Sequence, residues 1–225
     1  MTGVSEFQDE AKIRVPPAVY GSLRLLAHGI NRAYWRVSIE GAAVPSAGPV
    51  ILAPVHRSFI DFFVVSEVTR RPIFYMTKEE MWNSRLLGKF LDATGAFPVR
   101  REGVDRRSLS YAQKVLEHGE ALVLFPEGTR RSGTQIAHLH EGTAFLASRT
   151  GARIVPIGIG GTERSLPLGS KFPRPVSVTL VVGEPLAAEV QQRERATRHQ
   201  LRDTTEQLRS SLQLLYDEAR EKAAV

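Results

Sequence analysis

The sequence predicts an α/β protein: one domain with a mixed central sheet flanked by helices, preceded by an amphipathic helix and followed by a long helix. Short apolar segments rich in β-branched residues alternate with longer segments of helical periodicity through most of the chain. Hydrophobic residues make up 42% of the 225 residues, which is enough to bury a substantial core. The order of the strands does not follow from the sequence.

Residues 1–36 are predicted to form an N-terminal, amphipathic, membrane-associating segment, with a helix over residues 18–37. Apolar residues lie at helical spacing along it: Val19, Leu23, Leu26, Ile30, Ala33 and Val37. Basic residues recur every four positions on a neighbouring face: Arg24, His28, Arg32 and Arg36. Such a helix can rest in lipid headgroups or pack on the domain as an ordinary surface helix, and the sequence leaves both interpretations open.

Residues 37–185 are predicted to form the core, whose elements are delimited by turn and cap signals. Gly48-Pro49 separates the first two strands, and Gly119 and Gly151 end two helices. Strands are expected at residues 37–40, 50–53, 72–75, 96–99, 121–125, 153–157 and 176–182. Helices are expected at residues 58–69, 79–92, 104–118 and 140–150.

Residues 186–225 are predicted to form a helical tail, with a charged helix over residues 187–222. Leucines spaced along it form an apolar seam: Leu201, Leu208, Leu212 and Leu215. The seam either docks on the domain, the more usual outcome, or mediates self-association. The oligomeric state therefore does not follow from the sequence.

Charge and composition exclude several classes of protein. The formal charge of +6 and the isoelectric point of about 9.9 favour anionic partners, namely phosphate metabolites, anionic lipid surfaces or nucleic acid. The absence of cysteine excludes disulfides, thiolate metal sites and a cysteine nucleophile. Residues 1–14 do not have the pattern of a signal peptide, and no run of 18 apolar residues predicts a transmembrane span.

A histidine and an aspartate stand five residues apart where a strand passes into a helix, in the segment APVHRSFID (residues 53–61). On one regular helix His56 and Asp61 would lie roughly 140° apart, so they meet only if His56 lies in the loop and Asp61 in the first helical turns. Asp61 would then accept the Nδ1 proton and leave Nε2 as a general base. The pattern Ser58-x-x-Asp61 also fits a capping box in which Asp61 serves only the helix start.

Candidate anion sites follow two other strands. Arg100 and Arg101 come directly after a short apolar strand, and guanidinium groups match phosphate oxygens in a bidentate manner. A buried strand ends in PEGTRRSG (residues 126–133), a loop that could bind an anion although it lacks the P-loop spacing. Pro156, inside a predicted strand, indicates an edge, a bulge or a wall beside a site.

Two other chemistries are considered and not predicted. His138, His140 and Glu141 resemble half of a metal site, but histidines two residues apart do not share a helix face, so no metal is expected. Ser58 lies next to His56, yet the chain lacks the G-x-S-x-G turn of the serine hydrolases.

Four segments, taken in this order, resemble the glycerophospholipid acyltransferase family, in particular its lysophosphatidate type. The segment from His56 to Asp61 resembles the family's H-x4-D block, and the segment from Gly95 to Arg101 resembles its G-x-x-F-I-x-R block. Two later segments resemble the F-P-E-G-T-R block (125–130) and the V-P-hydrophobic block (155–157). In addition to these four, residues 139–145 resemble the family's segment after the third block. The resemblance covers residues 37–183 and implies a glycerol-3-phosphate acyltransferase-like fold.

The resemblance implies transfer of a fatty acyl group from acyl-CoA or acyl carrier protein to 1-acyl-sn-glycerol 3-phosphate, giving phosphatidic acid without a cofactor. His56 would be the base and Asp61 would orient it. Backbone amides near the helix start at Ser58 are considered as oxyanion donors, which the sequence itself does not show. The residues expected to bind the acceptor's phosphate are Lys78, Arg101 and Arg130. The residues expected to shape or line the acceptor site are Glu127, Gly128, Thr129 and Pro156. The residues considered for an acyl channel are Phe59, Phe62, Phe63 and Trp82.

Departures from the family pattern leave the acceptor open. Val55 stands where the family usually has Asn, Pro98 where it has Phe, and Arg100 where Asp is common. Glycerol 3-phosphate or another lipid headgroup is therefore an alternative acceptor.

Two other classes of protein are weighed against the enzyme. A non-catalytic lipid-binding protein is one, although the intact His56 and Asp61 argue against it. A nucleic-acid-binding domain is suggested only by the isoelectric point, and no nucleic-acid partner is predicted. Because the expected product is a lipid, we expect a cytoplasmic protein, peripheral on the inner face of the membrane.

Overall fold

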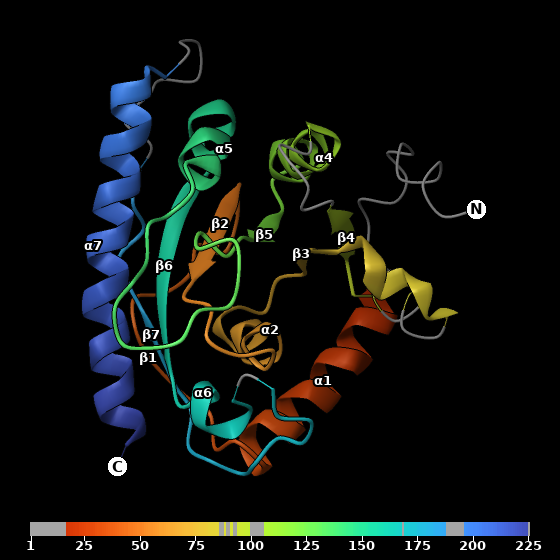
Figure 1. Cartoon of the computed structure of the whole chain (residues 1–225). Coiled ribbons are helices and arrows are strands. Elements are labelled where there is room, and N and C mark those ends of the chain that lie inside the picture. The colour runs from red at the N-terminus through yellow and green to blue at the C-terminus, as the bar shows by residue number, and fades with distance from the viewer. Residues whose placement is uncertain are drawn as a thin grey trace.

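A seven-stranded mixed sheet organises the computed structural model (Figure 1). The residues described are 17–85, 88, 91, 94–99, 106–167, 169–187 and 196–224. The strands are β1 (Ser38–Gly41), β2 (Val50–Pro54), β3 (Ile73–Lys78), β4 (Ala96–Val99), β5 (Ala121–Val123), β6 (Arg153–Gly160) and β7 (Thr179–Val182). The helices are α1 (Pro17–Ala33), α2 (Asp61–Val64), η3 (Val65–Val68), η4 (Glu79–Asn83), α4 (Arg106–Glu117), α5 (Gly142–Thr150), α6 (Thr162–Ser165) and α7 (Arg198–Ala223).

The strand order is β1-β7-β6-β2-β5-β3-β4, with β6 and β7 antiparallel and every other neighbouring pair parallel. The sheet is therefore mixed, as predicted. β2 lies between β5 and β6, and all five of its residues are buried. A parallel strand covered on both faces must be apolar throughout, and this explains why the sequence of β2 (VILAP) shows no alternation.

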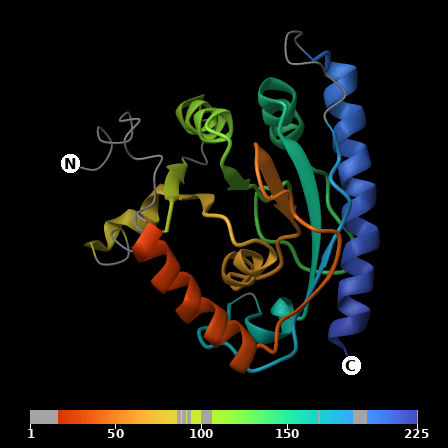
Figure 2. The ribbon, with the colours of Figure 1, turned by 180° about the vertical axis from the view of Figure 1, so that it is seen from behind.

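Helices cover both faces of the sheet (Figures 1 and 2). α4, α5 and α7 pack on one another and on one face, and α7 lies along β6 and β7. The backbones of α7 and β6 approach closely, because a Cβ at Gly158 or Gly160 would lie 2.1 or 2.2 Å from a carbonyl oxygen of α7. α1 and α2 contact each other on the other side. The predicted docking of the long C-terminal helix is thus observed.

Several predicted elements differ in extent. The helix expected at 58–69 is a short α-helix, Asp61–Val64, continued as a 3₁₀-helix. The segment expected as helix at 79–92 begins as the 3₁₀-helix η4, and only part of the remainder lies within the described residues. β6 runs on to Gly160, and β7 begins only at Thr179.

The last helix begins at Arg198, where Thr197 and Gln200 form a capping box. Among the described residues, no helix is both long enough and apolar enough to cross a membrane.

Candidate active site

His56 lies in the loop that follows the carboxyl end of β2. Two aromatic rings and one carboxylate contact its imidazole. Val55, at the position where the family usually has Asn, is buried and extends the pairing with β6 through its N–H to Ile157 O at 3.1 Å. The imidazole stacks on Phe125 with ring centroids 4.0 Å apart and meets Phe62 edge-on at 5.4 Å. Only 3% of His56 is exposed, so its ring cannot turn freely.

The structure brings His56 and Asp61 together. His56 Nδ1 is 2.9 Å from Asp61 Oδ2, and Asp61 is the first residue of α2. This is the arrangement, histidine in the loop and aspartate in the first helical turn, that the spacing required. With Nδ1 bound to the carboxylate, Nε2 is the ring nitrogen left for another partner.

The carboxylate of Asp61 is fully buried and accepts three further hydrogen bonds. The N–H groups of Arg57 and Ser58 donate to Oδ2 at 2.7 and 2.8 Å, and the hydroxyl of Thr162 donates to Oδ1 at 2.6 Å. The bond from Ser58 N–H is half of the predicted capping box, so Asp61 serves the helix start and the histidine together. It also corrects one expectation, because these backbone amides are engaged by Asp61 and are not free for an oxyanion.

A buried ion pair lies behind His56. Arg57 Nη1 is 2.6 Å from Glu127 Oε1, which also accepts the N–H of His56 at 3.3 Å. The guanidinium donates to Gln135 O at 3.3 Å and lies over the ring of Tyr216 in α7, 4.7 Å from its centroid. Glu127 Oε2 is buried without a hydrogen-bond partner among the described residues. Oε1 of Glu127 therefore accepts structural hydrogen bonds, while Oε2 has no donor in the described part of the chain.

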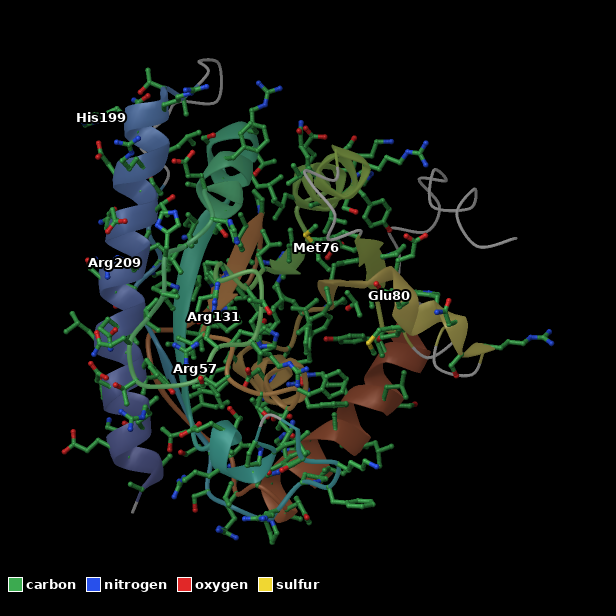
Figure 3. The ribbon with its side chains drawn as sticks, in the orientation of Figure 1. Arg57, Met76, Glu80, Arg131, His199 and Arg209 are labelled. Atoms are coloured by element: carbon green, nitrogen blue, oxygen red, sulfur yellow. The ribbon has the colours of Figure 1, made fainter. Side chains whose placement is uncertain are left out.

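The loop between β5 and α5 carries the predicted acceptor-site residues next to this pair. Gly128 has φ of +68°, and a Cβ there would lie 2.7 Å from the ring of His140, so both conformation and space favour glycine. Thr129 is half-buried and Arg130 is exposed. The N–H of Arg131 donates to His56 O at 2.9 Å, which ties the loop to the histidine. Figure 3 labels Arg131 on this loop.

α7 holds the far part of the same loop. Gln213 accepts the N–H of Ile136 at 2.8 Å and donates to Thr134 O at 3.0 Å. Burial raises the pKa of Tyr216, which keeps its hydroxyl protonated, and that hydroxyl donates to Gly133 O at 3.3 Å. Figure 1 shows the loop reaching across to α7.

Three predicted site residues are not joined to this cluster by the described contacts. The backbone of Lys78 ends β3, opposite Val99, but its side chain lies outside the described residues, as does all of Arg101. Pro156 pairs with Ala53 inside the sheet rather than at an edge, and its carbonyl accepts the N–H of Gly183 at 2.9 Å. Alternation along β6 puts its ring on the face of Gly158, toward α7.

Aromatic side chains continue from the histidine to the surface. Phe62 contacts His56, and Phe59 lies 5.9 Å from Phe62 and 6.1 Å from Phe63 between ring centroids. Phe59 and Phe63 are 38% and 39% exposed, an uncommon state for two neighbouring phenylalanines. Trp82 is partly buried against the main core.

Sequence reasoning missed Arg57, Thr162 and Tyr216. Arg57 is the neighbour of His56 in the sequence, but its partner Glu127 lies 70 positions away. Thr162 follows Gly160-Gly161 at the end of β6, and a polar residue just after a buried parallel strand was the signal that could have found it. Tyr216 lies 159 positions along the chain from Arg57, and no local pattern connects the two.

The fold and this site define a class of protein: an α/β domain whose histidine–aspartate pair lies at the carboxyl end of a central strand, beside a Gly-Thr-Arg loop. The profile of the family described as Acyltransferase matches residues 36–160, more than half of the chain, and the protein belongs to this family.

Two curated relatives and one solved structure extend the comparison. A 1-acyl-sn-glycerol-3-phosphate acyltransferase of Chlamydomonas reinhardtii is 30% identical over 178 residues, 72% of this chain and 53% of the relative. The Bacillus subtilis enzyme of the same name is 30% identical over 144 residues, 64% of this chain and 69% of the relative. The chain thus spans about half the length of the algal relative.

The solved structure is the 1-acyl-sn-glycerophosphate acyltransferase PlsC of Thermotoga maritima. It superposes with a TM-score of 0.67 at 21% identity, covering 93% of this chain and 92% of that one. The two proteins therefore share a fold.

Proposed function

We propose that the protein transfers a fatty acyl group from an acyl thioester, acyl-CoA or acyl carrier protein, to the free hydroxyl of 1-acyl-sn-glycerol 3-phosphate, giving phosphatidic acid. One observation carries the proposal: His56 is bound through Nδ1 to a buried aspartate that is itself fixed by three further hydrogen bonds. The relatives named as acyltransferases of this acceptor support the choice of substrate.

The reaction needs one proton carrier and no covalent enzyme intermediate. His56 Nε2 takes the proton of the acceptor hydroxyl as its oxygen attacks the thioester carbonyl. Asp61, which accepts hydrogen bonds at both of its oxygens, stabilises the imidazolium that forms. When the tetrahedral intermediate collapses, the carbon–sulfur bond breaks and His56 returns the proton to the departing thiolate. General-base help of this kind contributes roughly 10²- to 10⁴-fold to the rate.

Positive side chains position the acceptor through its phosphate. Arg130 lies exposed on the loop whose next residue, Arg131, is bonded to His56 O, and Lys78 and Arg101 complete the set proposed from the family resemblance. Guanidinium groups bind phosphate oxygens in a bidentate manner, which fixes the distance from phosphate to hydroxyl.

A membrane surface supplies the lipid substrate, and α1 is the element that meets it. Its outward face is apolar: Leu25 is 72% exposed, Leu26 62% and Ile30 45%. Its inward face is polar instead, since Asn31 Nδ2 donates to Glu67 Oε1 at 2.8 Å and His28 Nδ1 lies 2.6 Å from Glu67 Oε2. A helix that exposes two leucines and an isoleucine beside a basic residue, Arg32, is suited to lie in the headgroup region of an anionic membrane.

The proposal is tested by identifying the product. Purified protein with labelled palmitoyl-CoA is given lysophosphatidate, glycerol 3-phosphate or no acceptor, with lipid vesicles present, and lipid products are separated. Labelled phosphatidic acid formed only with lysophosphatidate supports the proposal. Label on glycerol 3-phosphate alone would move the assignment to the alternative acceptor. Vesicle binding by folded protein without turnover on either acceptor would favour a non-catalytic lipid-binding protein.

A further inference from the structure

Thr162 reaches the His56–Asp61 pair from a distant part of the chain. It is the first residue of α6, directly after β6, and it is fully buried. Its Oγ1 donates to Asp61 Oδ1 at 2.6 Å across 101 positions of sequence. Figure 1 shows α6 beside α2, the helix that Asp61 begins.

A turn that requires glycine fixes the position of this threonine. Gly161, just before it, has φ of +98°, and a Cβ there would lie 2.3 Å from Ser177 O. Only glycine fits such a turn without displacing the neighbouring backbone. The backbone of Thr162 is thereby held where its hydroxyl meets Asp61.

The bond differs from those of two other buried threonines, both in helices. Thr150 and Thr205 each donate to the carbonyl four residues earlier in their own helix, at 2.7 Å in both cases. Local bonding of this kind is the usual fate of a buried hydroxyl in a helix. Thr162 donates instead to a fully buried carboxylate in another element.

The two oxygens of Asp61 are held very unequally. Oδ2 accepts from His56 Nδ1 and from two backbone N–H groups, whereas Thr162 is the donor that holds Oδ1. A carboxylate can turn about its Cβ–Cγ bond, and a donor on the second oxygen stops this rotation. The three bonds to Oδ2 and the threonine hydroxyl on Oδ1 together set the plane of the carboxylate, and with it the direction of Oδ2 toward the imidazole.

We propose that Thr162 is a positioning residue of the acyl transfer: it sets the geometry of the His56–Asp61 hydrogen bond and touches no substrate. The inference rests on the proposed function. The proposed role of Thr162 differs from a purely structural one. Thr162 affects the chemical step and the state of His56 and leaves substrate binding unchanged.

Three variants test it: Thr162→Val removes the hydroxyl at nearly constant shape, Thr162→Ser keeps it, and Thr205→Val is the matched control. For Thr162→Val we expect kcat to fall roughly ten-fold, which corresponds to about 1.4 kcal/mol of barrier. The KM values for lysophosphatidate and palmitoyl-CoA should stay unchanged. Thr162→Ser should recover most of kcat, and Thr205→Val should lower the unfolding midpoint without changing kcat.

A spectroscopic readout separates this inference from the proposed function. The downfield proton signal of His56 Nδ1, assigned by its loss in His56→Ala, should move in Thr162→Val and stay in place in Thr205→Val. The positioning role would be overturned in either of two cases with an active wild type: if Thr162→Val has the wild-type kcat, or if Thr162→Ser does not restore kcat. An inactive wild type would contradict the proposed function, and an unmoved His56 signal in Thr162→Val would then reject the inference by itself.

Discussion

Replacing Leu25 by serine is expected to weaken binding of the protein to anionic vesicles. Burying a leucine side chain completely contributes about 1.5–3 kcal/mol. Leu25 is 72% exposed, so most of that amount, about 1–2 kcal/mol, remains to be gained when lipid covers α1. Because 1.4 kcal/mol is a factor of ten, the partition coefficient should fall roughly 5- to 30-fold.

Leu214 provides a matched control for this experiment. It is also 72% exposed, but it lies on α7, away from α1. Leu214→Ser removes the same apolar surface from another face and should leave vesicle binding unchanged. Both variants should keep the wild-type unfolding midpoint, because neither side chain packs in the core.

Co-sedimentation with vesicles of phosphatidylglycerol and phosphatidylcholine measures the partition coefficient. The proposed docking face predicts a loss for Leu25→Ser and wild-type binding for Leu214→Ser. Equal losses in both variants would mean that general surface hydrophobicity binds the vesicles. No loss in Leu25→Ser, with the wild type bound, would refute the role of α1.

Three further changes probe the site. Asp61→Asn removes the negative acceptor of the His56 Nδ1 proton and should lower kcat roughly 10²- to 10⁴-fold in steady-state assays. A near-normal kcat would show that the pair is not catalytic. Glu127→Gln leaves the buried charge of Arg57 uncompensated and should destabilise the protein by about 3–5 kcal/mol in urea unfolding, whereas wild-type stability would contradict the buried ion pair. Gly128→Ala places a side chain against His140 at a residue with positive φ and should lower the free energy of unfolding by about 1–3 kcal/mol. The change is measured as a lower thermal midpoint, and an unchanged midpoint would contradict the packing described.

Local patterns predicted the elements but not their arrangement. The apolar run at residues 50–53 predicted a strand, yet its central place follows from pairing with β5 and β6 in distant segments. Pro156 was expected at an edge or bulge because proline lacks an N–H. It sits inside the sheet because antiparallel pairing of β6 with β7 starts only at Ile157, so no ladder bond needs that N–H.

The orientation of α1 was beyond reach of the sequence for a related reason. Periodicity identifies an apolar and a polar face but not which face turns to the protein. Glu67, whose side chain in η3 is buried, bonds to His28 and Asn31 on the side of α1 that faces the domain, while Leu25 and Leu26 are exposed. Hydrophobicity alone would have placed the leucines against the domain.

The site was predictable where it is local and unpredictable where it is assembled from distant segments. His56 and Asp61 lie five residues apart. Helix geometry therefore predicted that they meet only if His56 lies in the loop and Asp61 in the first helical turns. Thr162 and Tyr216 enter from 101 and 159 positions away, and their roles depend on the strand order. The N–H of Ser58 donates to Asp61, and no spacing rule predicts this hydrogen bond.

The most direct test of the central claim is thiol release from palmitoyl-CoA by wild-type protein and by His56→Ala, each with and without lysophosphatidate. We expect lysophosphatidate-dependent release by the wild type and a loss of at least roughly 100-fold in the variant, with both proteins folded by circular dichroism. Acceptor-dependent release that survives the substitution would contradict His56 as the base.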